Sequence, residues 1–168
     1  MNPEAKKLGW KKDWPSLFYL LFALLGFSVS IYDIWVLQDL NLQLNVFLAL
    51  GIIFFIIGGT FRIISRKTLM KAGFSMTSSA KLQIVENQQL VTDGIYGKIR
   101  HPLYVGEILR NFGFALLVTS LYGFLVFTLA NLFLLNRIRI EEQMLIEEFG
   151  DEYKNYMKKT NRLIPHLY

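Results

Sequence analysis

Long runs of apolar residues are the feature that most constrains how this chain of 168 residues folds. Residues 16–37 contain a single acid, residues 45–64 contain a single base, and each run has about 20 residues. A helix of that length crosses roughly 30 Å of hydrocarbon. With 53% hydrophobic residues and a mean hydropathy of +0.35, the chain is too apolar for an ordinary soluble domain of this size. The two runs therefore predict two membrane-spanning helices.

A third apolar region, residues 103–136, has 34 residues and is too long for one span. Turn-forming residues at 119–123 interrupt it, so we expect a helical hairpin and four spans in total. Each arm then has only about 15 or 16 residues, slightly fewer than a span usually needs. We therefore expect the ends that carry His101 and Arg137 to lie at or below the level of the lipid headgroups.

The distribution of basic residues supports this topology. Four lysines precede the first run and six bases lie within residues 65–100, whereas residues 38–44 and the hairpin tip at 119–123 carry none. Cytoplasmic loops are enriched in lysine and arginine. The pattern predicts a multi-pass protein whose N- and C-termini are both cytoplasmic. The net charge of +5 then reflects membrane orientation, and we expect no nucleic-acid partner.

Composition excludes several other kinds of chemistry. The chain has no cysteine, which removes disulfides and thiolate catalysis. Its two histidines, His101 and His166, are far apart in sequence, so we expect no metal site. The basic N-terminal stretch precedes an apolar run that is too long for a signal peptide, and no small-residue cleavage site follows it. The oligomeric state is not specified by these patterns.

Two polar clusters lie at the two ends of the hairpin. Residues 94–106 form a cationic, turn-rich segment that leads directly into the apolar helix, and Arg137, Arg139, Glu141 and Glu142 follow its second arm. Ionisable groups at a membrane are costly and usually functional. Tyr96, His101 and Tyr104 add aromatic walls and hydrogen-bonding groups that would suit an adenosyl sulfonium ligand. We expect the active site at this cytosolic face.

Other polar residues have two interpretations. One helix face carries Glu107, Arg110 and Asn111. Either Glu107 and Arg110 form a buried ion pair that fixes the helix register, or these residues line a pocket. Arg137 and Glu141 also share a helix face. They form either a surface salt bridge or part of a site for a zwitterionic or cationic ligand. Beyond them, residues 138–160 predict an amphipathic helix on the cytosolic face, which Gly150 weakens or divides.

Several motifs occur together in the second half of the chain. Their order is Leu90-Val91-Thr92-Asp93-Gly94-Ile95-Tyr96, Arg100-His101-Pro102-Leu103-Tyr104-Val105-Gly106, a helical hairpin, Glu141-Glu142, and Phe149-Gly150-Asp151-Glu152-Tyr153. On these residues the chain resembles the isoprenylcysteine carboxyl methyltransferase family and, more distantly, the phospholipid N-methyltransferases. The resemblance covers residues 83–165. It implies an all-α, polytopic membrane protein, a single domain over residues 1–168, with two scaffold spans in residues 16–64 and a methyltransferase-like core in residues 83–165.

The resemblance also implies a cofactor and roles for individual residues. An enzyme of this kind uses S-adenosyl-L-methionine and transfers its methyl group to a lipophilic acceptor, such as a carboxylate of an isoprenylcysteine-like or other small lipid substrate. Arg137 falls where the family places a substrate-binding arginine, and we assign it that catalytic role. The cofactor-binding positions implied by the resemblance are Gln83, Gln88, Gln89, Leu90, Val91, Tyr96, His101, Pro102, Leu103, Tyr104 and Glu141.

Two other functions remain open on the sequence alone. A membrane reductase that uses NADPH is one, because sterol reductases share a similar C-terminal motif. A non-catalytic four-span scaffold is the other, although it would leave the clusters at Arg100 and His101 and at Arg137 and Glu141 without a role.

Overall fold

The computed structural model describes residues 6–7, 13–37, 45–74, 83–84 and 89–164. These residues are almost entirely helical. The helices are α1 (Trp14–Tyr32), continued by a π-helical turn η1 (Asp33–Leu37), α2 (Val46–Lys71), a 3₁₀ turn η3 (Gly94–Gly97), α3 (Pro102–Leu117), α4 (Leu121–Phe149) and α5 (Asp151–Lys159). Two two-residue strands, β1 (Lys6–Lys7) and β2 (Gln83–Ile84), pair antiparallel. Apart from this short ribbon, the described residues confirm an all-α fold.

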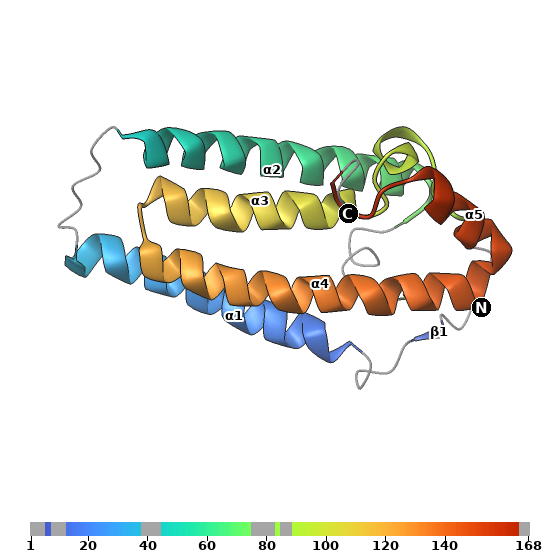
Figure 1. Cartoon of the computed structure of the whole chain (residues 1–168), viewed down its shortest axis with the longest axis horizontal. Coiled ribbons are helices and arrows are strands. Elements are labelled where there is room, and N and C mark those ends of the chain that lie inside the picture. The colour runs from blue at the N-terminus through green and yellow to red at the C-terminus, as the bar shows by residue number, and fades with distance from the viewer. Residues whose placement is uncertain (1–5, 8–12, 38–44, 75–82, 85–88, 165–168) are drawn as a thin grey trace.

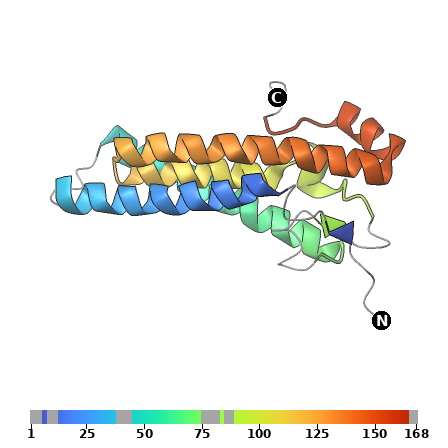
Figure 2. The same ribbon diagram turned by 90° about the horizontal axis from the view of Figure 1, so that it is seen from below.

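The four long helices form an elongated bundle, in which α2 packs along α3 and α1 packs along α4 (Figure 1). A turn after Leu117 joins α3 to α4, so these two helices form the expected hairpin. The start of α3, the end of α4 and the whole of α5 lie at one end of the bundle, at the right of Figures 1 and 2. The polar segments that flank the hairpin therefore meet at that end.

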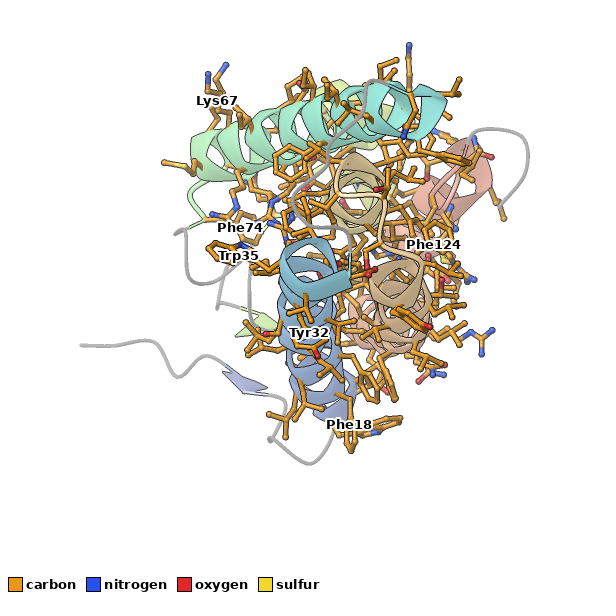
Figure 3. The ribbon with its side chains drawn as sticks, turned by 90° about the vertical axis from the view of Figure 1, so that its left-hand side faces the viewer. Phe18, Tyr32, Trp35, Lys67, Phe74 and Phe124 are labelled. Atoms are coloured by element: carbon orange, nitrogen blue, oxygen red, sulfur yellow. The ribbon has the colours of Figure 1, made fainter. Side chains whose placement is uncertain are left out.

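Three helices are long and apolar enough to cross a membrane: Trp14–Val36, Val46–Lys71 and Leu121–Phe149. The first two confirm the spans expected from the apolar runs. Helix α3 has 16 residues and is therefore shorter than a usual span. Large apolar side chains cover the outward surfaces of α1 and α2, as Phe18 does in Figure 3. Such a surface suits contact with lipid.

The second arm of the hairpin is longer than the sequence predicts. The pattern indicates a separate amphipathic helix over residues 138–160, but α4 continues without a break through Arg137 to Phe149. Residues 137–149 contain no glycine or proline and several strong helix formers, so nothing ends the helix there. The break falls at Gly150, whose φ of 55° is easily adopted only by glycine. Helix α5 follows as a separate element that buries Tyr153 and Tyr156.

Local signals explain where the other helices begin. The side chain of Asn45 accepts a hydrogen bond from the backbone N–H of Leu48 at 2.9 Å and caps α2. The hydroxyl of Ser120 accepts one from Gly123 at 2.9 Å and caps α4 directly after the hairpin turn. Pro102 occupies the first position of α3, where the missing N–H has no cost.

Glycines allow α2 and α3 to approach closely. A Cβ atom at Gly58 would lie 2.7 Å from the backbone of both Arg110 and Gly106, and one at Gly51 would lie 2.3 Å from the backbone nitrogen of Leu117. Small residues at helix interfaces in membranes permit this backbone contact. Gly59, in contrast, has no atom of the described residues within 4 Å of its Cβ position, apart from its own helix backbone and chain neighbours.

We expect Gly58→Ala to lower the thermal unfolding midpoint of the detergent-purified protein, because the added methyl group forces the two backbones apart. Overpacking of this kind costs about 1–3 kcal/mol. Gly59→Ala is the matched control and should leave the midpoint unchanged or raise it, since alanine favours the helix more than glycine does. Equal midpoints for the two variants would contradict the close packing described here.

Candidate active site

A buried carboxylate lies at the end of the bundle where the polar segments meet. Oε1 of Glu142 lies 2.9 Å from Nε of Arg100 and 3.3 Å from Nε2 of His101, and Oε2 lies 2.5 Å from Nη2 of Arg162. The Glu142 side chain is only 4% exposed. We call these four residues the Glu142 cluster. It joins α4 to the residues that precede α3 and to those that follow α5.

The segment after α5 is held against the start of α3 by backbone hydrogen bonds as well. The N–H of Arg100 donates to the carbonyl of Asn161 at 2.8 Å, and the N–H of His101 donates to that of Arg162 at 3.2 Å. The guanidinium of Arg100 also donates to the carbonyls of Met157 and Thr160. These contacts fix the backbone on both sides of His101.

On the other side of the His101 ring lies a second acid. Nδ1 of His101 is 3.9 Å from Oε2 of Glu141, and the same oxygen accepts a hydrogen bond from the hydroxyl of Tyr104 at 2.6 Å. The Glu141 side chain is 27% exposed, against 4% for Glu142. The two neighbouring acids therefore occupy different environments, and of the two only Glu141 is accessible to a ligand.

Arg137 lies one turn before Glu141, above the ring of Tyr104. Its guanidinium carbon is 5.7 Å from the ring centroid, and its Nε donates to Oδ1 of Asp13 at 3.1 Å. Asp13 directly precedes α1, so this ion pair ties the first helix to α4. We call His101, Tyr104, Arg137 and Glu141 the hairpin-mouth cluster.

Two further tyrosines, Tyr96 and Tyr156, are buried at this end of the bundle. Tyr96 is buried in η3, and its backbone carbonyl accepts a hydrogen bond from the hydroxyl of Tyr156 at 2.6 Å. Burial raises the pKa of Tyr96 well above its usual value, and the negative charge of Glu141 raises that pKa further. Burial also raises the pKa of Tyr156 to about 12. These phenols are therefore neutral hydrogen-bonding groups at physiological pH.

The structure brings some of the predicted site residues together and places others elsewhere or leaves them undescribed. It brings the four members of the hairpin-mouth cluster together, with Tyr96 near Glu141. Pro102 is buried at the start of α3, and Leu103 is half-buried. Gln89 is exposed and Leu90 and Val91 are half-buried in the segment that leads to η3. Gln83 pairs with Lys7 in the short ribbon, and Gln88 lies outside the described residues.

Sequence reasoning misses two features of this region. Asp13 belongs to no recognisable motif. Only the structure shows that it pairs with Arg137, which is 124 residues later in the sequence. The sequence indicates that only one of the two neighbouring acids can share the face of Arg137, but it does not identify the partners of Glu142, which pairs with Arg100 and Arg162. A helix turns by about 100° per residue, so two adjacent acids face different partners.

This arrangement defines a helical, polytopic membrane protein with a polar site at one end of an apolar hairpin. The family described as phospholipid methyltransferase matches residues 46–152, which contain the whole hairpin-mouth cluster and all of the Glu142 cluster except Arg162. The chain belongs to the phospholipid methyltransferase family.

Individual relatives agree with this assignment. The chain is 37% identical over 98 residues to the protein-S-isoprenylcysteine O-methyltransferase of Schizosaccharomyces pombe, covering 58% of this chain and 42% of that protein. It is 29% identical over 153 residues to that of Xenopus laevis, covering 90% of this chain and 52% of the relative. The chain thus spans about half the length of these relatives.

A solved structure is similar in fold. The eukaryotic intramembrane Ras methyltransferase ICMT (isoprenylcysteine carboxyl methyltransferase) has a TM-score of 0.70 and 25% sequence identity to this chain. The match covers 89% of this chain and 52% of that one. The resemblance inferred from the sequence motifs is confirmed by these comparisons.

Removal of the carboxylate in Glu142→Ala should destabilise this end of the bundle, because Arg100 would remain buried without its partner. Breaking one side of a buried ion pair typically costs about 3–5 kcal/mol. We expect a lower thermal midpoint and faster tryptic cleavage after Lys158 and Lys159. Glu147→Ala, an exposed position on the same helix, should change neither. Similar behaviour of the two variants would show that the Glu142 cluster does not hold the C-terminal segment.

Proposed function

We propose that the chain is a membrane methyltransferase that uses S-adenosyl-L-methionine and methylates a lipophilic acceptor. The acceptor group that we favour is a carboxylate of an isoprenylcysteine-like or other small lipid. The observation that supports this most is the hairpin-mouth cluster, in which side chains from α3 and α4 meet at the polar end of an apolar bundle. Membership of the phospholipid methyltransferase family supports the same reaction class.

The residues present fit the proposed cofactor. S-adenosylmethionine carries an ammonium group, a carboxylate, two ribose hydroxyls and an aromatic base. The accessible carboxylate of Glu141 suits the ammonium or the hydroxyls, and aromatic rings suit the base and the sulfonium. The hydroxyl of Tyr153 is buried without a hydrogen-bond partner among the described residues, and it lies near enough to both acids to feel their charge. It is a further donor in the same region.

The proposed roles follow from charge and position. When bound, the cofactor supplies an electrophilic methyl group on a positively charged sulfur. Glu141 and His101 hold it at the hairpin mouth, and Arg137 orients the acceptor carboxylate through its planar guanidinium. A carboxylate is already ionised at neutral pH, so no side chain has to act as a general base. Positioning and the exclusion of water then provide the rate, and orientation alone contributes on the order of 7–11 kcal/mol.

We further propose that α3 is a fourth span and that both termini are cytoplasmic. A 16-residue helix is about 24 Å long, slightly less than the hydrocarbon thickness of about 30 Å. Its polar start would then lie just inside the headgroup region, with α5 against the cytosolic membrane surface. An acceptor whose tail lies in the bilayer would reach the hairpin mouth from the side.

The two other functions are less well supported. A reductase would need a site for NADPH, and the relatives reported above are methyltransferases. A scaffold would not need a partly exposed carboxylate beside a buried histidine and an arginine. Equilibrium binding of S-adenosylmethionine and of NADPH to the purified protein distinguishes the three functions.

The proposed topology is tested with reporter fusions. Fusions at Asn41 and at Ser120 should report the outer side, and a fusion after Tyr168 should report the cytoplasm, because basic residues concentrate on one side only. Activity of a periplasm-specific or lumen-specific reporter at Asn41 and Ser120 is the expected result. A cytoplasmic Ser120 would exclude α3 as a span.

The proposed reaction is tested with radiolabelled cofactor and extracted membrane lipids. His101→Ala and Glu141→Ala should each weaken cofactor binding about tenfold, as expected for loss of a charge-assisted hydrogen bond. Arg137→Ala should keep cofactor affinity within about threefold and lower turnover by about 100-fold, because a misplaced acceptor loses the orientation term. Arg137→Lys should recover only part of that turnover.

Asp13→Asn provides the control for Arg137. This variant removes the charge of the ionic partner of Arg137 but leaves the guanidinium in place. If Arg137 orients the acceptor, Asp13→Asn should retain most of the turnover that Arg137→Ala loses. Equal losses of turnover in the two variants would indicate that Arg137 has only a structural role, as the partner of Asp13. If the wild type transferred no methyl group to any lipid fraction, the proposed reaction would be excluded.

A further inference from the structure

A second group of charges lies deeper in the bundle, away from the hairpin mouth. Glu107 of α3 forms ion pairs with Arg62 of α2 and with Arg110, whose Nη2 is 2.6 Å from Oε2. The hydroxyl of Tyr19 in α1 donates to the same oxygen at 3.1 Å, and Asn111 donates to that hydroxyl at 3.3 Å. The sequence leaves open whether Glu107 and Arg110 pair, and the structure shows that they do.

The ion pairs at Glu107 leave an excess of positive charge. Arg66 follows Arg62 by one turn on the same face of α2. We call Arg62, Arg66 and Arg110 the arginine cluster. Among the described residues, Arg62 and Arg110 share the carboxylate of Glu107, and Arg66 lies near enough to Arg62 for their like charges to repel. The Nε atoms of Arg66 and Arg110 are buried without a hydrogen-bond partner among the described residues. Such groups are costly at membrane depth unless an anion compensates them.

Two members of the arginine cluster, Arg62 and Arg66, lie near the depth of a lipid headgroup, and Arg110 lies deeper along α3. Counted from Val46, Arg62 is about 24 Å and Arg66 about 30 Å along α2, so the pair reaches the polar edge of a hydrocarbon layer about 30 Å thick. Gly106 allows this placement, because a Cβ there would lie 2.7 Å from Cγ of Arg62. The aliphatic part of Arg62 therefore crosses directly over α3.

The cluster also lies at a side of the bundle that lipid can reach. Helix α1 packs mainly on α4 and α2 mainly on α3, and α1 and α2 make little direct contact (Figure 3). The side chains of Arg62, Glu107 and Arg110 remain 20%, 19% and 28% exposed. Phe27 supports Arg110, whose guanidinium carbon is 5.9 Å from the ring centroid. A charged group with an apolar surrounding is suited to a molecule that has an anionic head and a hydrocarbon tail.

We propose that the arginine cluster binds the phosphate of an anionic phospholipid between α1 and α2. Guanidinium groups form bidentate hydrogen bonds to phosphate, and basic sites between membrane helices bind anionic headgroups. The lipid would neutralise the excess charge while its acyl chains lie along the exposed apolar faces of α1 and α2. None of its residues belongs to the hairpin-mouth cluster, and lipid binding there does not depend on the methyl-transfer reaction.

The test uses the full chain purified in detergent and titrated with phosphatidylglycerol or phosphatidylcholine that carry the same acyl chains. Native mass spectrometry counts the bound lipid. We expect one phosphatidylglycerol to bind at least about fivefold more tightly than phosphatidylcholine, and Arg66→Gln to remove about fivefold of that affinity. The Arg110→Gln variant should lower the affinity for phosphatidylglycerol by a similar factor. If that variant does not fold, the Arg66→Gln variant alone tests the proposal.

Lys67→Gln is the matched control. Lys67 is adjacent in sequence, carries the same charge and points away from the bundle in Figure 3. Its replacement should change lipid affinity by less than about twofold. Equal affinity of the wild type for the two lipids, or equal losses in Arg66→Gln and Lys67→Gln, would overturn the proposal. Displacement of phosphatidylglycerol by inorganic phosphate at equal concentration would do the same, because it would indicate a simple anion site.

Discussion

The buried carboxylate of Glu142 is the interaction on which the polar end of this molecule depends. A carboxylate that is removed from water is stable only with opposite charges and hydrogen bonds close by. Arg100, Arg162 and His101 provide them, and they come from segments that are about 60 residues apart in sequence. The same contact therefore closes the loop before α3 and fixes the segment after α5.

The orientation of His101 follows from that contact. Because Nε2 faces Glu142, the other ring nitrogen faces Glu141, Tyr104 and the accessible part of the hairpin mouth. Glu142 thus orients the histidine, whereas Glu141 remains partly exposed and able to bind a ligand. Two adjacent residues of one helix thus occupy different environments, one buried and one partly exposed, because their side chains point in different directions.

The features that depend on local pattern and on long apolar runs could be predicted from the sequence. The two long runs, the hairpin and the position of its turn are all recognisable, since length, hydropathy and turn residues report them directly. The motif around His101 and the acids at 141 and 142 also indicate the family. The continuation of α4 through Arg137 to Phe149 was not predicted, because a change from apolar to charged residues suggests a boundary although it does not break a helix. Two ion pairs could not be predicted, because each joins segments distant in sequence. They are Arg137 with Asp13 and Glu107 with Arg62.

The continuity of α4 gives the bilayer a mechanical connection to the site. This helix has 29 residues and is about 44 Å long, but only residues 121–136 are apolar, so the charged end that carries Arg137 and Glu141 extends beyond the apolar part as one continuous helix. Arg137 and Glu141 are carried rigidly on its polar end, while His101 and Tyr104 belong to the much shorter α3 and its first turn. A change in bilayer thickness that altered the packing of α4 against α3 would change the spacing between the two halves of the hairpin-mouth cluster. Acyl-chain length would in that case act on the geometry of this site without contacting it.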